Sequence, residues 1–165
     1  MNKWNIKSIF KELVIGAVIL FILSNIMSYF LAPELSSTEL PQVEVTLLDN
    51  SAYSLKKGKP VVLHFWATWC KVCKLEVDNI ERLSKKYEVL TIAVNSGNNA
   101  EITAYMKERE LSFKVLNDVD GSWAKKFNVE AFPTTFIYDG AGELKFTEVG
   151  YTTTAGLLAR MAMLH

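Results

Sequence analysis

The sequence of 165 residues predicts an α/β domain, with a central mixed β-sheet flanked by helices, that follows an N-terminal transmembrane helix. Three observations predict this class. A long uncharged segment lies near the N-terminus. Two later segments, Val61 to Trp66 and Val89 to Val94, are mostly apolar, as strands covered on both faces of a sheet are. Amphipathic segments alternate with these strands, which is the order of parallel crossover units.

The uncharged segment, residues 13–32, is predicted to be a membrane anchor. As a helix it would be ~30 Å long, the thickness of a bilayer core. Lysines precede it and Glu34 and Glu39 follow it, so residues 1–12 are expected in the cytoplasm and the C-terminal part outside. A cleaved signal peptide is the alternative, but Phe30-Leu31-Ala32 offers only one of the small residues that a cleavage site needs.

Residues 33–41 are rich in serine, threonine, proline and glutamate and are predicted to tether the anchor to a folded domain of residues 42–165. That domain is expected to begin with an edge strand from Val43 to Leu48, where apolar and polar residues alternate. Two predicted turns, Asp49-Asn50-Ser51 and Lys57-Gly58-Lys59-Pro60, then precede the buried strand Val61 to Trp66.

The first helix of the domain is predicted to follow this strand directly. Its inner face holds residues at helical spacing: Cys73, Val77, Ile80, Leu83 and Tyr87. Charged residues are expected on its outer face: Glu76, Glu81, Lys85 and Lys86. The buried strand Val89 to Val94 comes next, followed by an amphipathic helix around Ile102 to Arg109 and a short strand from Phe113 to Leu116.

The last third of the chain is predicted to complete the sheet with antiparallel strands. A short helix is expected from Ser122 to Phe127, followed by a strand from Thr135 to Tyr138 that Pro133 can precede but not occupy. A glycine-containing turn leads to a returning strand from Leu144 to Val149. A helix from Thr152 to Leu164 closes the chain.

Composition excludes some classes of function. The net charge is zero and no basic stripe is present, so a nucleic-acid partner is not expected. The chain has two cysteines, Cys70 and Cys73. In a domain outside the cytoplasm an isolated pair of this spacing indicates a functional site. A purely structural disulfide is the alternative, but so short a loop gains little stability from closure.

The two cysteines stand where the buried strand gives way to the helix. A helix N-terminus carries free amide protons and partial positive charge, which stabilise a thiolate at Cys70. Cys73 lies one turn further on and faces inward. The spacing therefore predicts that Cys70 attacks a target disulfide and Cys73 resolves the mixed disulfide.

No metal or cofactor is expected at this pair. A tetrahedral zinc site needs three or four cysteine or histidine ligands, and the chain offers only His64 and His165 besides the cysteines. A two-thiolate copper(I) site remains open as an alternative.

The residues around the cysteines carry a family resemblance. The segment Trp66 to Cys73, after a buried strand, and the later segment Phe132 to Phe136 together resemble the motifs of thioredoxin-like proteins, and the resemblance extends from Val43 to the C-terminus. The additional helix and strand at Ile102 to Leu116 resemble the insert of the membrane-anchored TlpA, ResA and DsbE type, including ScsD-like proteins. The resemblance implies a single-pass protein of the bacterial cytoplasmic membrane with its domain on the periplasmic side.

This resemblance also implies roles for residues outside the cysteine pair. Pro133 would be a cis proline opposite Cys70, and the backbone of Phe132 would pair with an extended substrate strand. Trp69 would shield the rim of the site. From the residues alone, Pro133 can equally be a strand starter and Trp69 a core aromatic.

At three places the sequence departs from the family pattern. His64 stands where thioredoxins carry a buried aspartate, and is either a proton relay to Cys73 or a hydrogen-bonded core histidine. Lys71 and Val72 replace the usual pair between the cysteines; Lys71 is expected to favour the thiolate. Asn98 occupies the position closest to a glutamate of cytochrome-type reductants and is most simply a turn residue.

The predicted function is therefore protein thiol–disulfide exchange by a membrane-anchored enzyme that acts on protein thiols or disulfides. A membrane thiol protein is expected as electron donor or acceptor, and cytochrome c maturation and copper or oxidative-stress tolerance are the processes that the resemblance suggests. Reductant, oxidant and isomerase remain open. Two rival functions are a non-catalytic copper(I) module and a thiol peroxidase, whose signature threonine would fall at Ala67.

Overall fold

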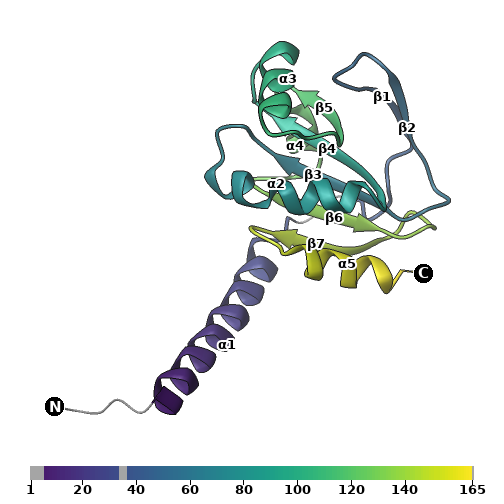
Figure 1. Ribbon diagram of the computed structural model, residues 1–165. Coiled ribbons are helices and arrows are strands. Elements are labelled where there is room, and N and C mark those ends of the chain that lie inside the picture. The colour runs from purple at the N-terminus through teal and green to yellow at the C-terminus, as the bar shows by residue number, and fades with distance from the viewer. Residues whose placement is uncertain (1–5, 34–36, 165) are drawn as a thin grey trace.

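The computed structural model describes residues 6–33 and 37–164, which form a long N-terminal helix and an α/β domain (Figure 1). The domain is built on a five-stranded sheet of order β5-β4-β3-β6-β7. Its strands are β3 (Val61–Trp66), β4 (Glu88–Val94), β5 (Lys114–Asp118), β6 (Thr134–Tyr138) and β7 (Leu144–Val149). The first three run parallel, and β6 and β7 are antiparallel to their neighbours. The predicted mixed sheet is confirmed.

Strand β3 lies at the centre of the sheet because it is paired on both edges and covered on both faces. It runs parallel to β4 and antiparallel to β6, and all its residues are buried. This explains the apolar run in the sequence, and the predicted bounds are those observed. Its side chains alternate between two hydrophobic clusters: Val62 and Trp66 join one, and Leu63 and Phe65 join the other.

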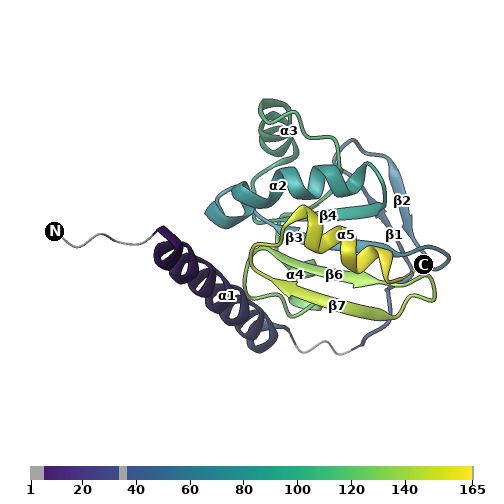
Figure 2. The same cartoon turned by 60° about the horizontal axis from the view of Figure 1, so that its bottom comes forward.

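The helices of the domain cover both faces. They are α2 (Lys71–Ser84), α3 (Asn99–Glu108), α4 (Ser122–Lys126) and α5 (Thr154–Ala162). Helices α2 and α5 pack beside one another on one face, as Figure 2 shows, and both contribute to the cluster around Trp66. Helix α4 packs on the other face through Ala124. The predicted helices are confirmed, with ends that differ by a few residues.

One strand prediction is wrong. β1 (Val43–Thr46) does not border the main sheet; within the described residues it pairs with β2 (Ala52–Leu55) in a separate antiparallel hairpin. After β1 the chain forms a hydrogen bond with β5, in which the backbone N–H of Leu48 donates to Val115 O at 2.8 Å. Strand β2 is only four residues long, too short for its alternation to be distinguished from a loop.

A second correction concerns Glu76, which was expected on the outer face of α2. Its side chain is fully buried, because α5 and the segment before it pack along the side of α2. The helical spacing of Cys73, Glu76, Val77 and Ile80 already places position 76 within the inward stripe. The outward assignment rested on charge alone.

Helix α1 (Ile6–Leu31) includes an apolar stretch, Ile9–Ser28, that is long enough to cross a bilayer, and none of its residues whose burial is described is buried. It overlaps the predicted anchor at 13–32. The end of α1 contacts β7, where the backbone N–H of Val149 donates to Ser28 Oγ at 2.9 Å. The start of the predicted cytoplasmic segment, residues 1–5, and Glu34 lie outside the described residues.

The later part of the predicted tether is attached to the domain. The backbone N–H of Leu40 donates to Gly142 O, and that of Leu144 donates to Thr38 O, each at 2.8 Å. Leu40 is buried against the domain. Residues 38–40 therefore run along the start of β7, and the middle of the tether, residues 34–36, lies outside the described residues.

Candidate active site

The two cysteines form a disulfide at the first turn of α2. Cys70 is the N-cap residue, in an extended conformation, and its Sγ accepts the backbone N–H of Cys73 at 3.2 Å. Both residues are buried, Cys70 at 8% and Cys73 at 2% exposure. The sulfur of Cys70 therefore lies where the helix presents its free amide protons, which stabilise a thiolate when the disulfide is reduced.

A cis peptide joins Phe132 to Pro133, directly before β6. The carbonyl oxygen of Phe132 lies 3.6 Å from Cys70 Sγ, so the loop faces the disulfide. The carbonyl oxygen of Pro133 accepts the backbone N–H of Gly150 at 2.8 Å, which ties the loop to the end of β7. The expected cis proline opposite Cys70 is confirmed.

Trp69 forms the rim of the site. Its side chain is 58% exposed, its indole N–H donates to Asn95 O at 3.1 Å, and its ring meets Phe132 edge to face at 5.7 Å. The core aromatic of this segment is Trp66, which packs on Tyr105 and Phe113. The structure thus decides between the two roles left open for Trp69, which lies at the surface and is not the core aromatic.

Lys71 and Val72, between the cysteines, are exposed at the start of α2. Neither makes a hydrogen bond or ion pair through its side chain among the described residues, so both are available to contact a partner. Leu75, one turn along the same helix, is 72% exposed. Its position on the helix was the only feature of the sequence that could have predicted the exposure of Leu75.

His64 lies on β3, on the face that α2 covers, because it is two residues from both Val62 and Trp66 and therefore points to the same side as they do. It is 3% exposed, and its Nδ1 is hydrogen-bonded to Thr135 Oγ1 at 2.9 Å. Burial lowers its pKa to about 3, so the imidazole is neutral at physiological pH. The geometry is that of a hydrogen-bonded core histidine on the cysteine side of the sheet.

Glu76 is a buried carboxyl on the same helix as the cysteines, and the sequence interpretation missed it. One of its oxygens accepts the backbone N–H of Thr152 at 2.9 Å, and the other has no hydrogen-bond partner among the residues that the structure describes. Burial, supported by the nearby charge of Glu148, raises its pKa to about 8. A protonatable group therefore links α2 to the segment before α5.

Asn98 does not contribute to this site. It is the N-cap of α3: its side chain accepts the backbone N–H of Glu101 at 3.0 Å, while Glu101 accepts the backbone N–H of Asn98 at 2.7 Å. This reciprocal capping box stabilises the start of the helix. Asn98 was expected to be a turn residue, and it lies in the connection before α3, where it caps the helix.

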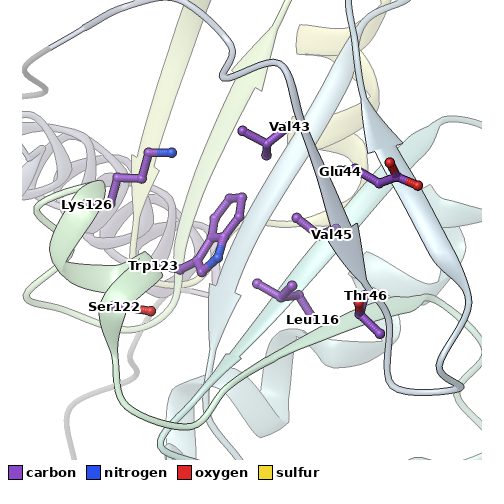
Figure 3. A pocket seen from close by; sticks show the side chains of 8 residues that line it. All are labelled: Val43, Glu44, Val45, Thr46, Leu116, Ser122, Trp123 and Lys126. Atoms are coloured by element: carbon purple, nitrogen blue, oxygen red, sulfur yellow. The ribbon is translucent and has the colours of Figure 1, made fainter.

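A surface pocket of about 410 Å³ lies away from the cysteines (Figure 3). It lies between β1 and α4, with Trp123, Lys126 and Leu116 among its lining residues. Neither cysteine lines it. Within the part of the chain that the structure describes, no group of three His, Cys, Asp or Glu side chains is placed to hold a metal ion.

Comparison with known proteins agrees with this geometry. The AhpC/TSA family model matches residues 32–147. The chain belongs to the AhpC/TSA family. It is 35% identical to the thioredoxin-like protein YneN of Bacillus subtilis over 70% of this chain and 72% of that protein. It is 32% identical to the thiol-disulfide oxidoreductase ResA of Bacillus cereus over 81% and 85%.

A solved structure shows the same fold. The exposed lipoprotein thioredoxin of Streptococcus pneumoniae has a TM-score of 0.67 and 27% identity, covering 75% of this chain and all of that one. Within the AhpC/TSA family, the disulfide at the start of α2 and the relatives together identify this chain as a thiol-disulfide oxidoreductase of the ResA type. The predicted fold and enzyme class are confirmed.

Proposed function

We propose that this protein is anchored in the bacterial cytoplasmic membrane by α1 and exchanges disulfides with protein substrates on the outer side. One observation supports it most strongly: Cys70 Sγ lies at the start of α2, opposite the Phe132 carbonyl, while Cys73 is almost inaccessible. An incoming substrate therefore meets Cys70 first. The apolar stretch of α1 and the similarity to an exposed lipoprotein support the location.

The exchange follows from these positions. The Cys70 thiolate attacks one sulfur of a substrate disulfide, and the other substrate sulfur leaves as a thiolate. The Cys73 thiolate then attacks Cys70 Sγ, which re-forms the Cys70–Cys73 disulfide and releases the reduced substrate. The same steps in reverse oxidise a substrate dithiol. Phe132 and Pro133 hold the substrate segment beside Cys70, and Trp69 bounds it on the α2 side.

In this proposal a thiol carrier in the membrane re-reduces or re-oxidises the cysteine pair after each exchange, and the substrates are thiol proteins of cytochrome c maturation or of copper or oxidative-stress tolerance. Mostly reduced cysteines in the intact cell, measured by alkylation, would support a reductant fed through the membrane. Mostly oxidised cysteines would support an oxidant or isomerase. A potential above about −150 mV would point to oxidation or isomerisation.

Two variants test the exchange itself. Cys70→Ser is expected to abolish exchange, and Cys73→Ser to accumulate mixed disulfides with substrate proteins, visible on non-reducing gels. Normal turnover by both variants would refute the proposal. Peroxide consumption by the wild type without exchange of protein disulfides would favour the peroxidase alternative instead.

A further inference from the structure

We propose that the rim of the active site rests on the surface of an anionic lipid bilayer. The inference builds on the proposed membrane anchor and adds a second contact between the protein and the membrane. The contact surface is the lipid rim, defined as Trp69, Lys71, Val72, Lys74, Leu75 and Tyr151.

The anchor meets the domain close to the disulfide. Ser28, at the end of the apolar stretch, accepts the backbone N–H of Val149 on β7. Val149 pairs with Thr134, directly after the cis proline. The next residue, Gly150, donates to Pro133 O. A continuous set of hydrogen bonds and strand pairings thus links the end of the apolar stretch of α1 to the loop that faces Cys70.

The same side of the molecule carries the lipid rim. In both views α1 extends toward the side at which α2 begins (Figures 1 and 2). Tyr151 follows Gly150 directly, and its hydroxyl accepts from Asn79 Nδ2 on α2 at 3.2 Å. The loop after β7 and the exposed face of α2 therefore form one surface, beside the point where α1 leaves the domain.

The composition of the rim favours lipid as its occupant. Trp69, Leu75 and Tyr151 are more than half exposed, at 58%, 72% and 53%. Tryptophan and tyrosine are the aromatic residues of the membrane–water interface. The two exposed lysines of the first turn, Lys71 and Lys74, alternate with Val72 and Leu75, so cationic and apolar groups share one surface, as in interfacial helices on anionic lipids.

Fluorescence of the full-length, oxidised chain in protein-free vesicles of phosphatidylglycerol and phosphatidylcholine tests this contact. The signal of Trp69 is the difference between the wild type and Trp69→Phe. Lipids brominated near the top of the acyl chains are expected to quench this emission. Acrylamide in the water is expected to quench it less than in the absence of vesicles. Trp69 emission that resists the brominated lipids and stays open to acrylamide would overturn the proposal.

Matched variants test the surface. Leu75→Ser is expected to reduce bromine quenching of Trp69, whereas Val119→Ser, an exposed apolar residue after β5 at the opposite edge of the sheet, leaves it unchanged. Lys71→Gln and Lys74→Gln should each lower the equilibrium constant for contact between the lipid rim and anionic vesicles about fivefold. Neither should have much effect on neutral vesicles. Equal quenching in all four variants would overturn the proposal.

Two further outcomes separate the possible failures. A chain that does not float with the vesicles refutes the membrane anchor of the proposed function. A chain that floats and exchanges disulfides, but whose Trp69 stays in water, refutes the lipid contact alone. Protection of Trp69 only in native membranes would assign the rim to a protein and would likewise overturn the lipid proposal.

Discussion

The Nδ1 atom of His64 on β3 lies 2.9 Å from the hydroxyl oxygen of Thr135 on β6, and the two residues are directly paired across the sheet. The pair is buried on the face that also holds the cysteines. A buried polar pair of this kind stabilises the fold only while both partners are present.

The first prediction concerns this pair. His64→Leu leaves the Thr135 hydroxyl without its partner and is expected to lower the free energy of unfolding by about 1–3 kcal/mol. Adding Thr135→Val should restore part of the loss. Urea unfolding of the oxidised single and double variants measures the coupling. Combining His64→Leu with Thr103→Val on α3 is the control and should give additive losses; additive losses for the first pair would show that the hydrogen bond contributes nothing.

Glu76 is expected to make stability depend on pH. The unfolded carboxyl releases its proton near 4.5, whereas burial keeps the proton to about 8 in the folded state. Between these values the folded state binds more protons, so the free energy of unfolding falls as pH rises, by up to about 1.4 kcal/mol per unit. Glu76→Gln removes this slope and is more stable than the wild type at pH 8.

Unfolding measured at several pH values from 4 to 9 tests this effect. Glu108→Gln, on the exposed surface of α3, should keep the wild-type slope. Parallel pH profiles for the wild type and Glu76→Gln would mean that the folded carboxyl titrates as it does in the unfolded chain.

Asn98 should affect stability and not chemistry. Asn98→Ala removes the side-chain acceptor of the Glu101 N–H and is expected to cost about 1 kcal/mol. Asn98→Asp keeps an acceptor and should restore most of it. Urea unfolding and insulin reduction measured on the same samples distinguish the two effects. An exchange rate that falls in both variants, with stability unchanged, would assign Asn98 to the active site.

Lys71 is expected to tune the reactivity of Cys70 slightly. Its charge lies beside the thiolate but in water, so Lys71→Gln should slow alkylation of reduced Cys70 at neutral pH by an amount equivalent to tenths of a kcal/mol. Lys86→Gln, beyond the other end of α2, is the matched charge control. High salt should reduce the difference. A tenfold loss of reactivity would show that Lys71 acts by more than screened charge.

Much of the fold could be predicted because local patterns report burial. Strand β3 was predicted with its observed bounds, since a strand covered on both faces is apolar at every position. The short strand β2 was missed because four residues carry too little periodicity. β1 was assigned to the wrong sheet because alternation shows that a strand is half covered and does not show which strand it pairs with.

The candidate site divides in the same way. Local patterns suffice to place both cysteines at the start of a helix after a buried strand, because strand and helix periodicities meet at Cys70. They also place His64 in a buried strand and position 76 in the inward stripe of α2. The partners of these polar groups depend on the tertiary fold: His64 meets Thr135, 71 residues away, through strand register, and Glu76 meets Thr152 because α5 packs beside α2. Such partners come from distant segments brought together by folding, which no local pattern encodes.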